Sequence, residues 1–129
     1  MTVQPVEYPN KDTGDTIVNG VVLPKWTLGD GDQGAKVKAG EFADKTIHFH
    51  GPFGTGGSVG IRGSNKIDPD EETAADWFYL TDPAGEAITD KTSASGFVIM
   101  ENTLWISPDC TDGNISTAVE CSLLAKKEN

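Results

Sequence analysis

The sequence predicts an all-β fold: a single-domain antiparallel β-sandwich, jelly-roll-like or immunoglobulin-like, preceded by an extended N-terminal arm. Short apolar and β-branched runs recur between turn signals along most of the chain. The 129 residues include 15 glycines and 7 prolines, more than helical bundles use, and they suit one domain. The one helical candidate, residues 70–75, is too short to be stable without packing.

The chain divides into an arm, residues 1–14, and a sandwich domain, residues 15–129. The arm carries two prolines and no apolar periodicity, so it lies outside the expected core. It is either a frayed tail, which is the simpler interpretation, or a segment that becomes ordered against a neighbouring subunit. In the second case its apolar anchors would be Val3, Val6 and Tyr8.

The first expected strands follow the arm. Residues 16–23 are apolar and β-branched apart from Asn19-Gly20, which marks a turn or a bulge. Residues 45–50 alternate strictly, and successive side chains of a strand point to opposite faces. The inward side chains are then Ile47 and Phe49, and the outward ones are Thr46, His48 and His50.

The alternation continues over residues 57–63, where we expect another strand. Between the two runs, residues 51–56 have the composition of a hairpin loop. In the second strand the inward residues are expected to be Val59 and Ile61, and the outward ones Ser58, Gly60 and Arg62.

Residues 76–81 are dense in aromatic side chains and precede Asp82-Pro83-Ala84-Gly85, whose composition is typical of a tight turn. In a strand over this run, either Trp77 and Tyr79 or Phe78 and Leu80 face the core. The pair that faces outward must be covered by something else. Because large exposed apolar patches mark contact sites, the leftover pair indicates a subunit interface.

The last expected strands cover residues 97–100, 103–107 and 117–125, with a long polar loop over 108–116. If residues 104–108 pair with 117–125 as a hairpin, Cys121 falls opposite Leu104 rather than Cys110. The two cysteines are also too few for a disulfide framework. We therefore expect two free thiols.

The charge balance excludes several partners. The chain has 20 acidic and 10 basic residues, which gives a formal charge of -10. Nucleic acid is therefore an unsuitable partner. No run reaches the roughly 18 apolar residues of a membrane helix, so no membrane partner is expected. The N-terminus lacks the charged and apolar regions of a signal peptide, which indicates a protein made and used without secretion.

His48 and His50 are the candidate metal ligands, because an H-x-H pair on a strand places both imidazoles on one face. A closed site needs three or four ligands and the chain has no other histidine, so we expect no metal. The acidic loops 29–34 and 68–72 fit no calcium-loop pattern and are expected to be solvated.

No nucleophile motif or phosphate-binding loop is present, so we expect no catalytic residues, no cofactor and no enzymatic activity. A small metal-dependent β-barrel enzyme built on the two histidines is the last of the alternatives. The aromatic side chains offer another: they would form either a sugar-stacking platform or core and interface packing. These side chains are Trp26, Trp77, Trp105 and Tyr79.

From Gly51 onward, the order of turns and strands resembles a group of small phage virion proteins that look like capsid decoration (cement) proteins. The matching segments are 51–54, 57–65, 77–80, 81–85, 87–89, 101–108, 111–113 and 117–127. Residues 66–75 form an insert relative to that pattern, and the first 40 residues do not match it.

The resemblance implies a non-enzymatic virion protein, made in the host cytoplasm, that sits on the outer capsid surface and stabilises the shell. Its partners would be the major capsid protein and copies of itself, often as a trimer at threefold positions. The candidate interface residues are Val3, Val6, Tyr8, Trp77, Tyr79 and Trp105. The alternative is a tail- or fibre-associated module that binds a receptor or carbohydrate through its tryptophans.

Overall fold

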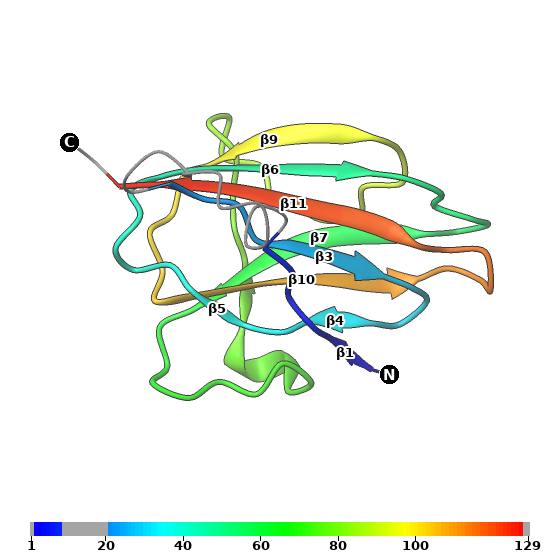
Figure 1. The fold of residues 1–129 in the computed structure, drawn as a ribbon, viewed down its shortest axis with the longest axis horizontal. Helices are drawn as coiled ribbons and strands as arrows, with labels where there is room; N and C mark the ends of the chain where they lie inside the picture. The colour runs from blue at the N-terminus through cyan, green and yellow to red at the C-terminus, as the bar shows by residue number, and fades with distance from the viewer. Residues whose placement is uncertain (1, 9–20, 128–129) are drawn as a thin grey trace.

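The computed structural model describes residues 2–8 and 21–127, which fold as a β-sandwich of two packed sheets (Figure 1). The predicted all-β, single-domain sandwich is confirmed. In place of the helical candidate at residues 70–75, the chain forms a 3-10 turn, η1 (Ala74–Asp76). Within the described ranges, no helix has the length and apolar character needed to cross a membrane.

The first sheet has the strand order β1–β4–β10–β7–β8, and β5 also pairs with β10. Its pairs are antiparallel except that of β1 with β4, which is parallel. The strands are β1 (Val3–Gln4), β4 (Gln33–Gly34), β5 (Val37–Lys38), β7 (Ser58–Ser64), β8 (Phe78–Tyr79) and β10 (Trp105–Asp112).

The second sheet has the order β2–β11–β6–β9, and β3 also pairs with β11. All of its pairs are antiparallel. The strands are β2 (Val21–Val22), β3 (Lys25–Leu28), β6 (Asp44–His50), β9 (Ser95–Ile99) and β11 (Val119–Lys126).

The core lies between the sheets, and the long strands fill it through their alternating side chains. On β6, Ile47 and Phe49 are buried while Thr46 and His48 are exposed, as predicted. Val59 and Ile61 of β7 are also buried as predicted. Buried side chains from other elements complete the core: Trp26, Leu28, Leu80, Ile88, Ile106, Val119 and Leu123.

The hairpin predicted at residues 51–56 is wrong, because this loop joins β6 to β7 and these strands belong to different sheets. The loop crosses the end of the sandwich instead of reversing within one sheet. Gly51, Gly54 and Gly56 have positive φ angles of 107°, 65° and 79°. Such angles suit glycine in either kind of turn, so the composition does not distinguish them.

The second hairpin considered, between residues 104–108 and 117–125, is also wrong. β10 continues through Pro108 to Asp112, which shortens the expected loop, and it lies in the sheet opposite β11. Pro108 falls between the part of β10 that pairs with β5 and the part that pairs with β4. A break in the ladder tolerates the missing N–H of proline. The predicted free thiols are confirmed: Cys110 and Cys121 are both free and buried.

The described part of the arm, residues 2–8, packs against its own chain. The Gln33 N–H donates to the Thr2 carbonyl at 2.9 Å, and Glu7 forms a bridge with Lys25. The frayed tail is therefore wrong for this segment, which pairs with β4 of the first sheet and with Lys25 of the second. Residues 16–20 of the predicted strand 16–23 lie outside the described residues.

The aromatic run 76–81 forms only the short strand β8 before its turn. The turn itself is confirmed: the Gly85 N–H donates to the Asp82 carbonyl at 2.9 Å, and Gly85 has a φ of 82°. Leu80 enters the core, whereas Trp77 and Tyr79 lie on the outer side of the first sheet.

Candidate functional site

The outer face of the first sheet holds a buried polar cluster formed by Arg62, Ser107, Asp109 and Tyr79. Arg62 faces outward from the core, as predicted, but the chain covers it and it is only 6% exposed. Its guanidinium donates to the Ser107 hydroxyl at 2.7 Å and to the Glu71 carbonyl at 3.1 Å. It also lies 4.8 Å from the centre of the Trp77 ring, within cation–π range.

The chain itself covers this cluster. A β-carbon at Gly60 would lie 2.9 Å from both the Ile88 carbonyl oxygen and the Tyr79 ring, so glycine permits this close approach. Trp77 is 8% exposed and packs on Arg62. The inference that this aromatic pair needs a second subunit to cover it is therefore wrong for Trp77.

Asp109 is the buried carboxyl of the cluster and is 5% exposed. It accepts a 2.5 Å hydrogen bond from the Tyr79 hydroxyl. Burial raises the pKa of Asp109, and the Tyr79 hydrogen bond and the Arg62 charge oppose that rise. Burial together with Asp109 raises the pKa of Tyr79 to about 12. Among the described residues, Arg62 Nε and Asp109 Oδ1 have no hydrogen-bond partner.

The raised pKa of Asp109 predicts a pH-dependent effect of Asp109→Asn. Native Asp109 holds its proton more tightly than in the unfolded chain, so its ionised form weakens folding at pH values above its native pKa. The free energy of unfolding of the variant should therefore exceed that of wild type most near neutral pH. The gain should shrink as pH falls through the native pKa toward the ordinary Asp value.

Urea unfolding of both proteins across a pH series measures this difference, and the other carboxylates cancel in the comparison. A relative gain that grows on acidification would show that Arg62 outweighs burial at Asp109, contrary to the expectation.

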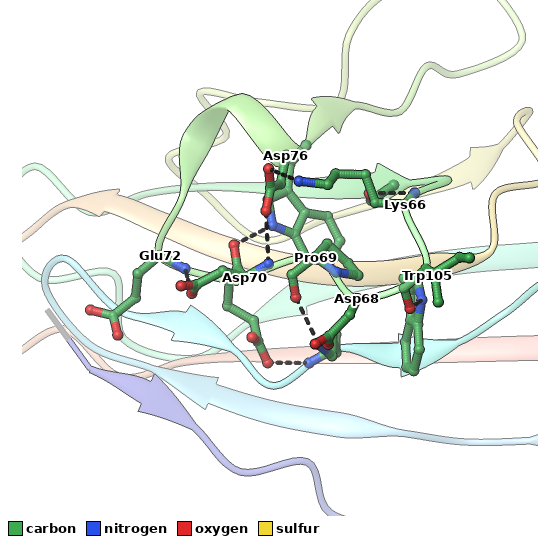
Figure 2. Close-up of polar contacts among 12 residues, drawn as sticks. Lys66, Asp68, Pro69, Asp70, Glu72, Asp76 and Trp105 are labelled. Carbon is green, nitrogen blue, oxygen red and sulfur yellow. Dashed lines mark hydrogen bonds and ion pairs between the residues drawn. The ribbon is translucent and has the colours of Figure 1, made fainter.

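The acidic loop, residues 65–76, covers Arg62 and is held by its own polar contacts (Figure 2). Lys36 reaches across to it, donating to Asp68 Oδ1 at 2.6 Å and to the Pro69 carbonyl at 2.7 Å. Lys66 donates to Asp76 at 2.6 Å, and the Trp77 indole donates to the Asp70 carbonyl at 2.8 Å.

These contacts explain why the loop is acidic. Hydrogen bonds from Lys36 and from Lys66 lower the pKa values of Asp68 and Asp76 respectively; for Asp76 the Asp70 backbone N–H contributes more than Lys66 does. The expectation of a solvated loop at 68–72 holds for Asp68, Asp70 and Glu72, which are exposed. It did not include the contacts with Lys36: Asp68 binds its ammonium, and Glu71 Oε2 accepts its backbone N–H at 2.9 Å. The loop closes the outer face of the first sheet.

The other acidic loop, residues 29–34, also uses its charge internally. Asp32 is buried, and its Oδ2 accepts the Gly29 N–H and the Gln4 side-chain amide, each at 2.8 Å. This carboxylate therefore shapes a turn and fastens the N-terminal segment, which corrects the expectation that the loop is solvated.

The outer face of the second sheet carries the histidine pair. The rings of His48 and His50 are 4.7 Å apart, which confirms that they share one face. His50 Nδ1 lies 3.2 Å from Glu120 Oε2, and Lys25 Nζ lies 2.9 Å from Glu120 Oε1. Across residues 2–8 and 21–127, no three His, Cys, Asp or Glu side chains are grouped to hold a metal ion.

Three apolar side chains lie exposed on this same face: Leu124, Val98 and Met100. The register places Thr46 of β6 between Leu124 of β11 and Val98 of β9. The sequence reasoning missed these residues, although alternation over 97–100 gives Val98 and Met100 the same outward side. They form the apolar patch of the second sheet.

The predicted aromatic platform is not assembled. Trp26 is fully buried in the core and Trp77 lies beneath the acidic loop. Trp105 is half-buried, with Lys36 and Lys38 near its ring and its indole donating to the Ile67 carbonyl at 3.2 Å. Trp77 and Trp105 lie on the outer face of the first sheet, where both indoles donate to carbonyls of the acidic loop, whereas Trp26 lies in the core. The alternative of internal packing therefore describes Trp26 and Trp77, and Trp105 keeps partial exposure.

The remaining candidate interface residues are spread over the surface. Val3 and Val6 are half-buried, and Val6 packs against the core of its own chain. Tyr8 is exposed, and Tyr79 is half-buried in the polar cluster. The structure does not bring these residues together with Trp105 into one surface. Compared with known proteins, the chain matches no family model, no curated protein and no solved structure.

Proposed function

We propose that this chain is a non-enzymatic structural protein of a bacteriophage virion, a capsid decoration protein that binds the outer capsid surface and stabilises the shell. The proposal starts from the resemblance of residues 51–127 to such proteins. The observation that favours it most is the apolar patch of the second sheet, displayed on a well-packed sandwich. Exposed apolar side chains grouped on a rigid face are typical of contact sites.

The electrostatics suit this role. The formal charge of -10 keeps the protein from competing with the capsid for packaged DNA. The acidic loop and Asp32 use carboxylates in internal contacts, so these groups hold the surface loops in shape. A rigid surface loses little conformational entropy on docking, which favours binding.

The mechanism is mass action. A protein that binds the assembled shell, and does not bind free capsid subunits, shifts the equilibrium toward the intact particle. Many copies on one particle add their effects. No reactive group is needed, and burial raises the pKa of both thiols, which makes them poor nucleophiles.

Mixing the purified protein with undecorated capsids of its phage tests the proposal. We expect saturable, stoichiometric binding and a higher capsid melting temperature. A bovine serum albumin sample at the same concentration controls for nonspecific effects. Capsids that bind no protein, or that melt unchanged when saturated, would contradict the proposal.

The alternative is a tail or fibre module that binds carbohydrate, and it has less support because Trp26 and Trp77 are buried within the chain. Trp105 is the tryptophan of the three that retains partial exposure. Loss of binding on a glycan array after Trp105→Ala, with folding intact, would favour that alternative instead.

A further inference from the structure

Among the described strands, β9 is the longest that ends a sheet. In the orders given above, the sheets end at β1, β8, β2 and β9, and the first three have two residues each. β9 has five residues and pairs only with β6 within the described part of the chain. Its other edge faces away from the sandwich at the top of Figure 1.

This edge lacks the devices that protect natural sheet edges. Very short strands, charged side chains, proline and bulges are the usual protections against pairing with another chain. Residues 92–100 contain no charged residue and no proline, and the register between β9 and β6 is regular. At one end of the strand the Met100 N–H donates to the Thr81 carbonyl at 3.0 Å, and Lys91 Nζ lies 4.7 Å from the centre of the Phe97 ring. Over Ser95–Ile99 a monomer would therefore display a template for another strand, with Lys91 as the nearby charge.

We propose that this edge pairs with a second copy of the chain, β9 against β9 in antiparallel orientation, about a twofold axis at Phe97. This axis places each Val98 opposite Gly96 of the partner subunit and each Ile99 opposite Ser95 of the partner subunit. On the outer face each Val98 then meets a glycine, and on the inner face each Ile99 meets a serine while the two Phe97 side chains meet each other at the axis. The sequence is self-complementary in this register, as a twofold interface requires.

Gly96 supplies the space for this fit. A β-carbon on Gly96 would meet one atom within 4 Å, the Ile47 carbonyl oxygen at 3.7 Å, so the outer side above it is open. Val98, on the same outer face, is 48% exposed in the monomer. In the dimer Val98 fills the space above Gly96 of the partner subunit, and both lose exposed surface.

The pairing joins the second sheets of the two copies and places their apolar patches side by side. It forms a dimer rather than the trimer that the family resemblance implies, because antiparallel pairing of identical edges closes after two copies. The inference rests on β9 alone and holds whether or not the protein decorates a capsid.

Sedimentation equilibrium over a range of protein concentrations tests the pairing. We expect a monomer–dimer equilibrium for wild type. Val98→Lys should weaken the dimer at least ~10-fold, because a lysine on an edge strand opposes pairing. Gly96→Leu should do the same by filling the space that Val98 of the partner subunit needs. Thr27→Lys, exposed on β3 of the same sheet, is the matched charge control and should leave the dimer unchanged.

Hydrogen exchange provides a second readout. The β9 amides that make no bond to β6 should exchange more slowly in wild type at high concentration than in Val98→Lys. Raising the salt concentration should tighten the dimer, because both copies carry a charge of -10. A wild-type monomer at every concentration, a trimer, or a dimer that both edge variants leave intact would overturn the proposal.

Discussion

Replacing Trp26 by alanine should lower the free energy of unfolding by about 3 to 5 kcal/mol, the range for truncating a large buried aromatic side chain. Trp26 is fully buried on β3 between the two sheets. Its indole N–H donates to the Ala35 carbonyl at 2.9 Å, so truncation removes that bond as well as leaving a cavity. Urea denaturation followed by circular dichroism measures the change.

Two variants control this measurement. Trp26→Phe keeps an aromatic ring but removes the N–H, so it should lower the free energy of unfolding less than Trp26→Ala does. Thr27→Ala, the neighbouring exposed position on the same strand, should change stability by no more than about 0.5 kcal/mol. A loss below about 1 kcal/mol for Trp26→Ala would mean that Trp26 is not a central core residue.

Replacing Arg62 by alanine should lower the free energy of unfolding by about 3 kcal/mol. The cause is the loss of a buried polar network rather than a cavity in the core. The substitution removes hydrogen bonds to Ser107 and to the Glu71 carbonyl, and it removes the cation beneath the Trp77 ring. It also leaves the buried Asp109 without a positive charge nearby. Losing one member of a buried polar network leaves the others unsatisfied, which is costly.

The Arg62→Ala, Asp109→Asn double variant separates charge from packing. If Arg62 offsets the charge of Asp109, the double variant should be more stable than the sum of the two single effects predicts. Urea unfolding of the four proteins gives this coupling energy. Strict additivity would mean that Arg62 acts only through packing and its hydrogen bonds to the loop.

Alternation gave correct faces for β6 because that strand lies inside a sheet with one face on the core and the other exposed. The same reasoning on β7 placed Val59 and Ile61 inward and Arg62 outward correctly, but it did not predict that Arg62 is buried. The two-residue periodicity of a strand indicates which side chains share a face. It contains no information on whether a distant loop covers that face. The acidic loop that buries Arg62 is held by Lys36, a residue far away in the sequence.

The connections between strands were less predictable than the strands. Glycine-rich residues 51–56 suit a turn within one sheet or a crossing between two sheets, because local backbone preferences are the same in both. Strand β10 was predicted to end before Pro108, and it continues because the neighbouring ladder is interrupted there. Both features depend on which strands are neighbours, which local sequence does not encode.

The candidate surfaces were predicted from aromatic side chains, because large aromatic residues are common in binding sites. The structure buries Trp26 and Trp77 and exposes Val98 and Met100 instead. The outward side of β9 could have been found by applying alternation to residues 95–100. The unpaired edge could not, since a strand becomes an edge only through the order of the whole sheet.

The positions of β10 and β11 have a consequence for synthesis on the ribosome. β10 joins β4 and β5 to β7, and β11 joins β2 and β3 to β6, so each sheet is held together by one of the last two strands. While those strands are still inside the exit tunnel, neither sheet has its central member. The strands before β10 therefore cannot complete either sheet, and folding should be slow because it depends on distant pairings.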